Sequence, residues 1–284
     1  MNKKVSVARL SIFSNSILII LKLSVGLISG SVSIISEAIH SFMDLLASFV
    51  AFFSVRISDT PADERHPYGH GKFENISGVI EALLIFVAAF WIIYEAIKKI
   101  SHPEDVEKIG LGFAVMLISA VVNFFVSRKI YRVAKETDSV ALEADALHLK
   151  TDVYTSVGVA SGLLLMWLTG FHLVDPIAAI LVALLILKES FELFSKAYAP
   201  LLDLALPPAE VADISAMIQK RCVGQMSFHD LRTRKAGNYK YIDFHLNLDP
   251  EKTVREAHEI CDLIEEDIKK AFENTEVTIH VENF

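Results

Sequence analysis

Two matching stretches of sequence decide the fold, EAIHSFMDLLAS at residues 37–48 and DALHLKTDVYTS at residues 145–156. Each one reads acid, Ala, aliphatic, His, three residues, Asp, three residues, Ser, so the pattern is an internal repeat. Both stretches lie within long apolar runs, where an ionisable side chain is costly and usually marks a pathway. The repeat therefore predicts two buried helices that carry the chemistry of the protein.

The histidine and second acid of each stretch have the spacing of metal ligands. His40 and Asp44 lie four residues apart, as do His148 and Asp152, so each pair shares one helix face. Two such helices packed face to face offer two imidazoles and two carboxylates, a set that four-coordinate Zn²⁺ accepts. A bound cation also neutralises the carboxylates and makes their burial tolerable.

A single His-x₃-Asp pair could equally be a polar contact between helices, but two matched copies favour a metal site. Glu37 and Asp145 come one turn earlier. We expect them nearer an aqueous mouth and do not count them as ligands.

The distribution of apolar residues divides the chain into a membrane domain, residues 1–203, and a charged domain, residues 204–284. A helix needs roughly 20 residues to cross the hydrocarbon of a bilayer. We expect six spans, at about 9–30, 33–57, 75–98, 110–132, 140–169 and 174–193.

Lysine and arginine gather on one side of these spans, which predicts the orientation. Both termini, the loop at 59–73 and the charged domain fall on the basic side. We therefore expect a multi-pass protein of the cell (inner) membrane with both termini in the cytoplasm.

Net charge and cysteine usage exclude other classes of protein. The formal net charge is −8, which argues against nucleic acid as a partner. Cys222 and Cys261 form no CxxC pair, so they indicate neither a disulfide framework nor a thiolate metal site. We expect both to be packing residues of a domain in a reducing compartment.

The loop after the second span carries a second group of metal-ligand types. Asp63, His66 and His70 are spaced to converge, and glycines 69 and 71 let the backbone turn tightly. Three such ligands would form a weaker, exchangeable site. The alternative is a polar loop whose histidines only face water.

The charged domain predicts a helix from Pro207 to about Arg221, strands at 227–234 and 240–249, a helix from Thr253 and a strand at 276–282. The order α-β-β-α-β suggests a small sheet with helices on one face. It also holds four histidines, a concentration that favours metal handling: His229, His245, His258 and His280.

These residues resemble the cation diffusion facilitator family, in particular its bacterial zinc-exporting members. The most specific matches are residues 145–156, the loop HPYGHGK at 66–72, and HDLRTR at 229–234. The resemblance covers essentially the whole chain. It implies a homodimer of six-span protomers with a ferredoxin-like cytoplasmic domain that binds metal at the dimer interface.

The resemblance also implies site residues. His40, Asp44, His148 and Asp152 would form the transport site, although some bacterial members carry Asp at the position of His40. The loop site would be Asp63, His66 and His70. The cytoplasmic site would be His229, His245, His258, His280 and Glu282, with Glu282 where Asp is usual. A charge pair at the dimer hinge would be Lys72 and Asp203.

We therefore expect a secondary transporter that exports Zn²⁺ in exchange for protons, because metal and protons compete for the same ligand atoms. Imidazole suits Zn²⁺, Co²⁺ or Cd²⁺ better than Mn²⁺ or Mg²⁺, and the same ligands do not exclude Fe²⁺, Co²⁺, Ni²⁺ or Cd²⁺. A same-family exporter of Fe²⁺, Mn²⁺, Cd²⁺ or Co²⁺ is an alternative. A membrane metalloenzyme is disfavoured, because the His-Glu-x₂-His motif does not occur. A non-transporting metal sensor remains an alternative that flux measurements would separate.

Overall fold

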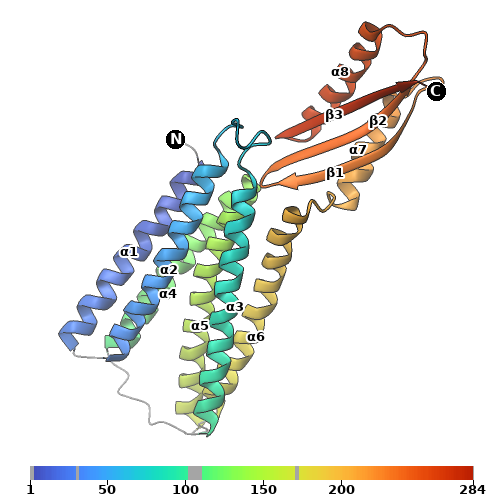
Figure 1. Cartoon of the computed structure of the whole chain (residues 1–284). Helices are drawn as coiled ribbons and strands as arrows, with labels where there is room; N and C mark the ends of the chain where they lie inside the picture. Colours follow the sequence, from blue (N-terminus) through green and yellow to red (C-terminus); the bar gives the residue numbers. More distant parts are fainter. Residues whose placement is uncertain (1–2, 30–31, 102–110, 170–172, 284) are drawn as a thin grey trace. The chain divides into compact units, whose positions relative to one another are not determined.

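A computed structural model describes residues 3–29, 32–101, 111–169 and 173–283 (Figure 1). The chain divides into two compact units, Met1–Tyr198 and Ala199–Phe284. Some side chains within helices also fall outside the description: those of residues 29, 32–37, 39, 40, 111–113, 159, 160, 162–169 and 175.

The described part of the first unit is mostly helical. Its helices are α1 (Lys3–Ser29), α2 (Val32–Ser58), α3 (Lys72–Ser101), α4 (Leu111–Glu136), α5 (Val140–Thr169) and α6 (Val174–Tyr198). Each coincides with one of the apolar runs in the sequence, and α1, α4 and α6 continue several residues beyond the expected spans. The extensions mix charged with apolar residues, so mean hydropathy falls there and does not mark the helix ends.

Close packing of small residues holds these helices together. α3 packs along α6, α1 along α2, and α4 along α5, while α5 also contacts α2, α3 and α6 (Figure 1). Ala82, Ala89 and Ala197 are fully buried between helices, as are Ala141 and Ala144 of α5. Small side chains let helix backbones approach closely, which is how helices associate within a bilayer.

The outer faces of the bundle are apolar and exposed. Ile28 is 85% exposed, Val87 68% and Phe125 66%. Four described segments have the length and composition to cross a membrane: Lys3–Ile28, Ser41–Ser58, Lys72–Ser101 and Ala114–Glu136. A bundle with polar groups inside and apolar groups outside is suited to lipid.

A buried carboxylate ties one end of the bundle together. Glu74, at the beginning of α3, is 0% exposed. It accepts hydrogen bonds from Lys4 Nζ of α1 at 3.0 Å, from Ser58 Oγ of α2 at 2.9 Å, and from Ser139 Oγ just before α5. Because a buried charge requires such partners, this end of four helices is fixed as one polar cluster.

The second unit contains a sheet of three strands. Its elements are η1 (Ala199–Leu202), α7 (Pro208–Arg221), β1 (Ser227–Ala236), β2 (Tyr239–Leu248), α8 (Val254–Ala271) and β3 (Thr275–Asn283). The order α-β-β-α-β agrees with the sequence prediction. β2 is central, antiparallel to β1 and parallel to β3.

Alternation along β2 places its apolar side chains in the core of this unit. Ile242, Phe244, Leu246 and Leu248 are at most 2% exposed and pack with α7 and α8. Both cysteines are free, Cys261 is buried, and both pack in this core as predicted. The opposite face of β2 is left with polar residues, His245 among them.

Candidate metal centres

The first candidate centre lies between α2 and α5. Asp44 Oδ1 is 2.9 Å from His148 Nε2, and ligand atoms of Asp44, His148 and Asp152 all lie within 4.8 Å of one another. Asp44 is 5% exposed, and the other two residues are partly buried. The structure thus brings together three of the four residues selected from the repeat. His40 lies on α2, but its side chain is outside the described residues.

Polar neighbours surround these three residues. Asn123 of α4 donates from Nδ2 to Asp152 Oδ2 at 3.2 Å. His148 Nδ1 is buried without a hydrogen-bond partner among the described atoms. A ligand carboxylate held by an amide keeps its orientation, and such outer contacts tune metal affinity.

Asp145 does not lie at an aqueous mouth, which corrects the sequence expectation. It is 1% exposed, and its Oδ1 accepts from Ser11 Oγ of α1 and Ser48 Oγ of α2, each at 3.0 Å. The serine that ends one copy of the repeat thus binds the acid that begins the other. The hydroxyl donors make the burial of this carboxylate tolerable, so Asp145 links three helices beside the centre.

Sequence reasoning missed one acid close to this centre. Glu81 of α3 is 0% exposed, accepts from Ser77 Oγ at 3.2 Å, and lies near enough to Asp145 and His148 for charge interaction. Its signal in the sequence is an isolated acid inside an apolar span, which alone suggests function. No second acid or histidine follows Glu81 at helical spacing, so the sequence shows no ligand pair there.

The loop between α2 and α3 forms the second candidate centre. Asp63 Oδ1 is 3.4 Å from His66 Nδ1, and Asp63 Oδ2 is 3.5 Å from His70 Nε2. The two imidazole rings are 4.4 Å apart between centroids. The three predicted residues therefore converge, and the turn that brings them together passes through Gly69 at φ +79°, a conformation that glycine adopts without strain.

Local hydrogen bonds preorganise this loop. Asp63 Oδ1 accepts from the backbone N–H of His66 at 2.7 Å and of Arg65 at 2.9 Å. The His66 contact is the main cause that lowers the pKa of Asp63, so the carboxylate is held ionised. His70 Nδ1 is 3.3 Å from the Thr60 carbonyl, and a proton donated there leaves Nε2 free as a ligand.

The third candidate centre lies on the open face of the sheet. His229, His245 and His280 are in register on β1, β2 and β3, so their rings stand side by side. Neighbouring ring centroids are 5.1 Å and 4.9 Å apart. Glu282 completes the group, with Oε1 at 3.0 Å from His245 Nδ1. His229, His245 and Glu282 offer ligand atoms within 4.8 Å of one another.

Among the described residues, His258 lies outside the sheet group, and the pairing of Lys72 with Asp203 is not tested. His258 of α8 is 76% exposed at its side chain and pairs with Asp262 at 3.7 Å. Lys72 and Asp203 belong to different compact units, so their pairing stays a prediction. Within its own unit, Asp203 Oδ1 is 3.4 Å from Arg234 Nη1.

An apolar bundle with buried imidazole and carboxylate ligands, joined to a domain that presents histidines, defines a membrane protein that handles metal cations. The model of the cation efflux transmembrane domain matches residues 8–202, and that of the cation efflux protein cytoplasmic domain matches residues 206–284. The chain belongs to the cation diffusion facilitator family, as the resemblance indicated.

Similar proteins cover almost the full chain. The uncharacterized transporter sll1263 of Synechocystis sp. is 36% identical over 92% of this chain and 84% of its own length. The cation-efflux pump FieF of Shewanella oneidensis is 34% identical over 96% of this chain and 92% of its own. A solved structure of CzrB is 42% identical over 28% of this chain and 98% of its own, with a TM-score of 0.27.

Proposed function

We propose that this protein exports divalent transition-metal ions from the cytoplasm in exchange for protons, with Zn²⁺ as the first candidate. The observation that carries the proposal is the convergence of Asp44, His148 and Asp152 between two membrane helices. Membership of a cation efflux family supports the direction of transport.

The ligand types support zinc. Imidazole together with carboxylate suits Zn²⁺, Co²⁺ or Cd²⁺ better than Mn²⁺ or Mg²⁺, which prefer oxygen ligands. His40 is proposed as the fourth ligand, because it lies one helical turn from Asp44 on α2. Four protein ligands would enclose the ion without water, as a dehydrated cargo requires.

Proton exchange follows from the same ligands. Metal binding needs neutral imidazole and ionised carboxylate, so a proton and the metal exclude each other at these atoms. In the proposed cycle, the centre opens to the cytoplasm, releases protons and takes up metal. After the bundle rearranges, protons from the other side displace the ion, and the two conformations differ in access.

The proposed architecture has six spans per protomer over residues 1–203, both termini in the cytoplasm, and a ferredoxin-like regulatory domain over residues 204–284. The order α7-β1-β2-α8-β3 supports that fold. The match to a dimerisation domain supports a homodimer. Lys72 and Asp203 are proposed as the charge pair at its hinge.

The other two centres are proposed as cytoplasmic sites that regulate transport. The loop site would use Asp63, His66 and His70. The domain site would use four residues of the sheet and one residue of α8. The sheet residues are His229, His245, His280 and Glu282, and the residue of α8 is His258. Metal that bridges two acidic domains would reduce their repulsion and draw them together.

Flux through proteoliposomes tests the proposal. We expect Zn²⁺ flux to follow an imposed pH gradient, and antiport is refuted if an active protein ignores that gradient. Asp152→Ala should abolish flux while the protein still folds. The control is Glu95→Gln, which should keep wild-type flux because Glu95 is an exposed acid at the far end of α3.

Two alternatives have distinct outcomes. A non-transporting sensor would bind metal, but neither the wild type nor Glu95→Gln would produce flux. An exporter of another ion, such as Fe²⁺, Mn²⁺, Cd²⁺ or Co²⁺, would show that ion as the best competitor of Zn²⁺ flux. The competition should shift toward Mn²⁺ in His40→Asp, since that change exchanges an imidazole for an oxygen ligand.

A further inference from the structure

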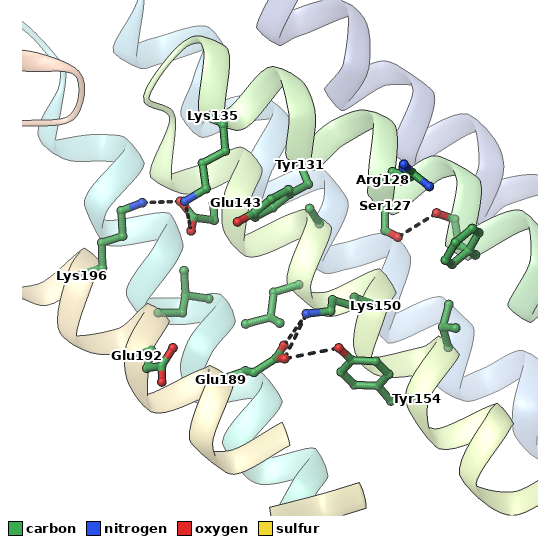
Figure 2. Close-up of a pocket in the computed structure, with 15 residues that line it drawn as sticks. Ser127, Arg128, Tyr131, Lys135, Glu143, Lys150, Tyr154, Glu189, Glu192 and Lys196 are labelled. Carbon is green, nitrogen blue, oxygen red and sulfur yellow. Dashed lines mark hydrogen bonds and ion pairs between the residues drawn. The ribbon is translucent and has the colours of Figure 1, made fainter. Parts of the chain in front are cut away.

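A pocket of about 700 Å³ lies between α4, α5 and α6 (Figure 2). On α5 it is lined by Leu147, Lys150 and Tyr154, which follow one helix face. His148 and Asp152 do not line it. The pocket is therefore separate from the candidate transport centre.

The walls of the pocket combine charge with apolar surface. Two of its carboxylates have cationic partners within the lining, as Figure 2 shows: Glu189 accepts from Lys150 at 2.9 Å, and Glu143 accepts from Lys135 at 2.9 Å and from Lys196. Phe124, Val153 and Leu193 supply apolar walls between these pairs.

Arg128 is the exception among the lining cations. It is exposed, and no carboxylate of the described residues forms an ion pair with it. The lining carries four basic and three acidic side chains, the latter being Glu143, Glu189 and Glu192. The excess of one positive charge favours an anionic occupant.

The depth of the pocket limits what can fill it. Lys150 lies about 15 Å from the beginning of α5 at 1.5 Å per residue, within a bundle that has apolar outer faces. Paired charges at such depth still present polar atoms that acyl chains alone do not satisfy, which favours an occupant with a polar part. A phospholipid offers both parts, a charged headgroup for the basic residues and acyl chains for the apolar faces.

We propose that this pocket binds an anionic phospholipid, with the headgroup phosphate at Arg128 and the acyl chains against the apolar surface of α4, where Phe125 is 66% exposed. Volumes of 300–1,000 Å³ are typical of ligand sites. Basic pockets between membrane helices bind anionic headgroups in the same way. Arginine is favoured here because its guanidinium can bind two phosphate oxygens at once.

Native mass spectrometry of the detergent-purified full chain tests this proposal, with phosphatidylglycerol and phosphatidylcholine as probes. The test variant is Arg128→Gln, and the control is Lys129→Gln, an exposed neighbour on α4 that does not line the pocket. Both changes remove one positive charge, so they affect non-specific attraction equally.

We expect wild type and Lys129→Gln to retain phosphatidylglycerol in preference to phosphatidylcholine, and Arg128→Gln to bind it roughly 10- to 100-fold more weakly, the effect of one charge-assisted contact. Equal retention by Arg128→Gln overturns the proposal, as does equal binding of the two lipids. Displacement by glycerol phosphate at equal concentration would assign the site to a free phosphate. Loss of the dimer in Arg128→Gln with phosphatidylglycerol retained would assign the pocket to a second copy of the chain.

Discussion

Replacement of Asn123 by Leu tests the centre through a residue that is not itself a proposed ligand. Asn123 is 5% exposed on α4, and its Nδ2 donates to Asp152 Oδ2 at 3.2 Å. Its Oδ1 is buried without a hydrogen-bond partner. Leu has nearly the same shape, so Asn123→Leu removes the donor and also removes an unsatisfied acceptor.

The expected magnitude follows from this single contact. Loss of a hydrogen bond to a metal ligand typically weakens metal affinity about 10- to 100-fold, which is about 1.4–2.7 kcal/mol. Because Asp152 stays in place, the maximal rate should change less than the KM for Zn²⁺. The assay is the concentration dependence of Zn²⁺ flux in proteoliposomes.

The control is Ser119→Ala, one turn earlier on the same helix. Ser119 is 5% exposed, and its Oγ is buried without a partner, so its removal should leave the KM unchanged. An unchanged KM in Asn123→Leu, with normal folding, would show that the hydrogen bond to Asp152 does not support metal binding. If the KM for Zn²⁺ rose equally in Ser119→Ala and Asn123→Leu, the cause would be a general disturbance of α4.

Three further predictions concern the sheet domain. Phe244→Ala should destabilise it by about 3–5 kcal/mol because Phe244 is a fully buried aromatic of β2, as chemical denaturation of the full chain in detergent would record. Thr253→Ala should cost about 1 kcal/mol because it removes the capping box that Thr253 forms with Glu256 at the beginning of α8, and a lowered melting temperature would reveal it. Arg221 lowers the pKa of Asp267 through a hydrogen bond, so the pair adds stability above the ordinary carboxyl pKa of about 4 and loses it as the pH falls below that value. Asp267→Asn should flatten this part of the pH dependence of the melting temperature, and an identical profile would contradict the assignment.

The repeated pattern in the sequence was sufficient to predict the helices of the centre, because helical spacing fixes which residues share a face. It could not predict Asp145 as a buried link, since the hydroxyl donors Ser11 and Ser48 come from helices distant in sequence. Glu81 stands alone in its span, and its proximity to Asp145 and His148 of α5 is visible only in the packed bundle. Burial of an acid depends on partners that only the packed bundle reveals.

The sheet domain was predicted more completely. Strict alternation over β2 indicated which face would be buried, and Phe244 and Leu246 are indeed in the core. The alignment of His229, His245 and His280 across three strands could not be predicted from the sequence, because strand register depends on pairing between segments that are distant in the chain.

The contacts of Glu74 have a mechanical consequence. Since Lys4, Ser58 and Ser139 all bind this one carboxylate, separating α3 from α1, α2 or the beginning of α5 at that end would break a hydrogen bond to a buried charge. α3 has 30 residues and is about 45 Å long. A tilt of about 10° beside Glu74 would move the far end of α3 sideways by about 8 Å at that length, so a small rotation at the buried carboxylate becomes a large displacement at the opposite end of the helix.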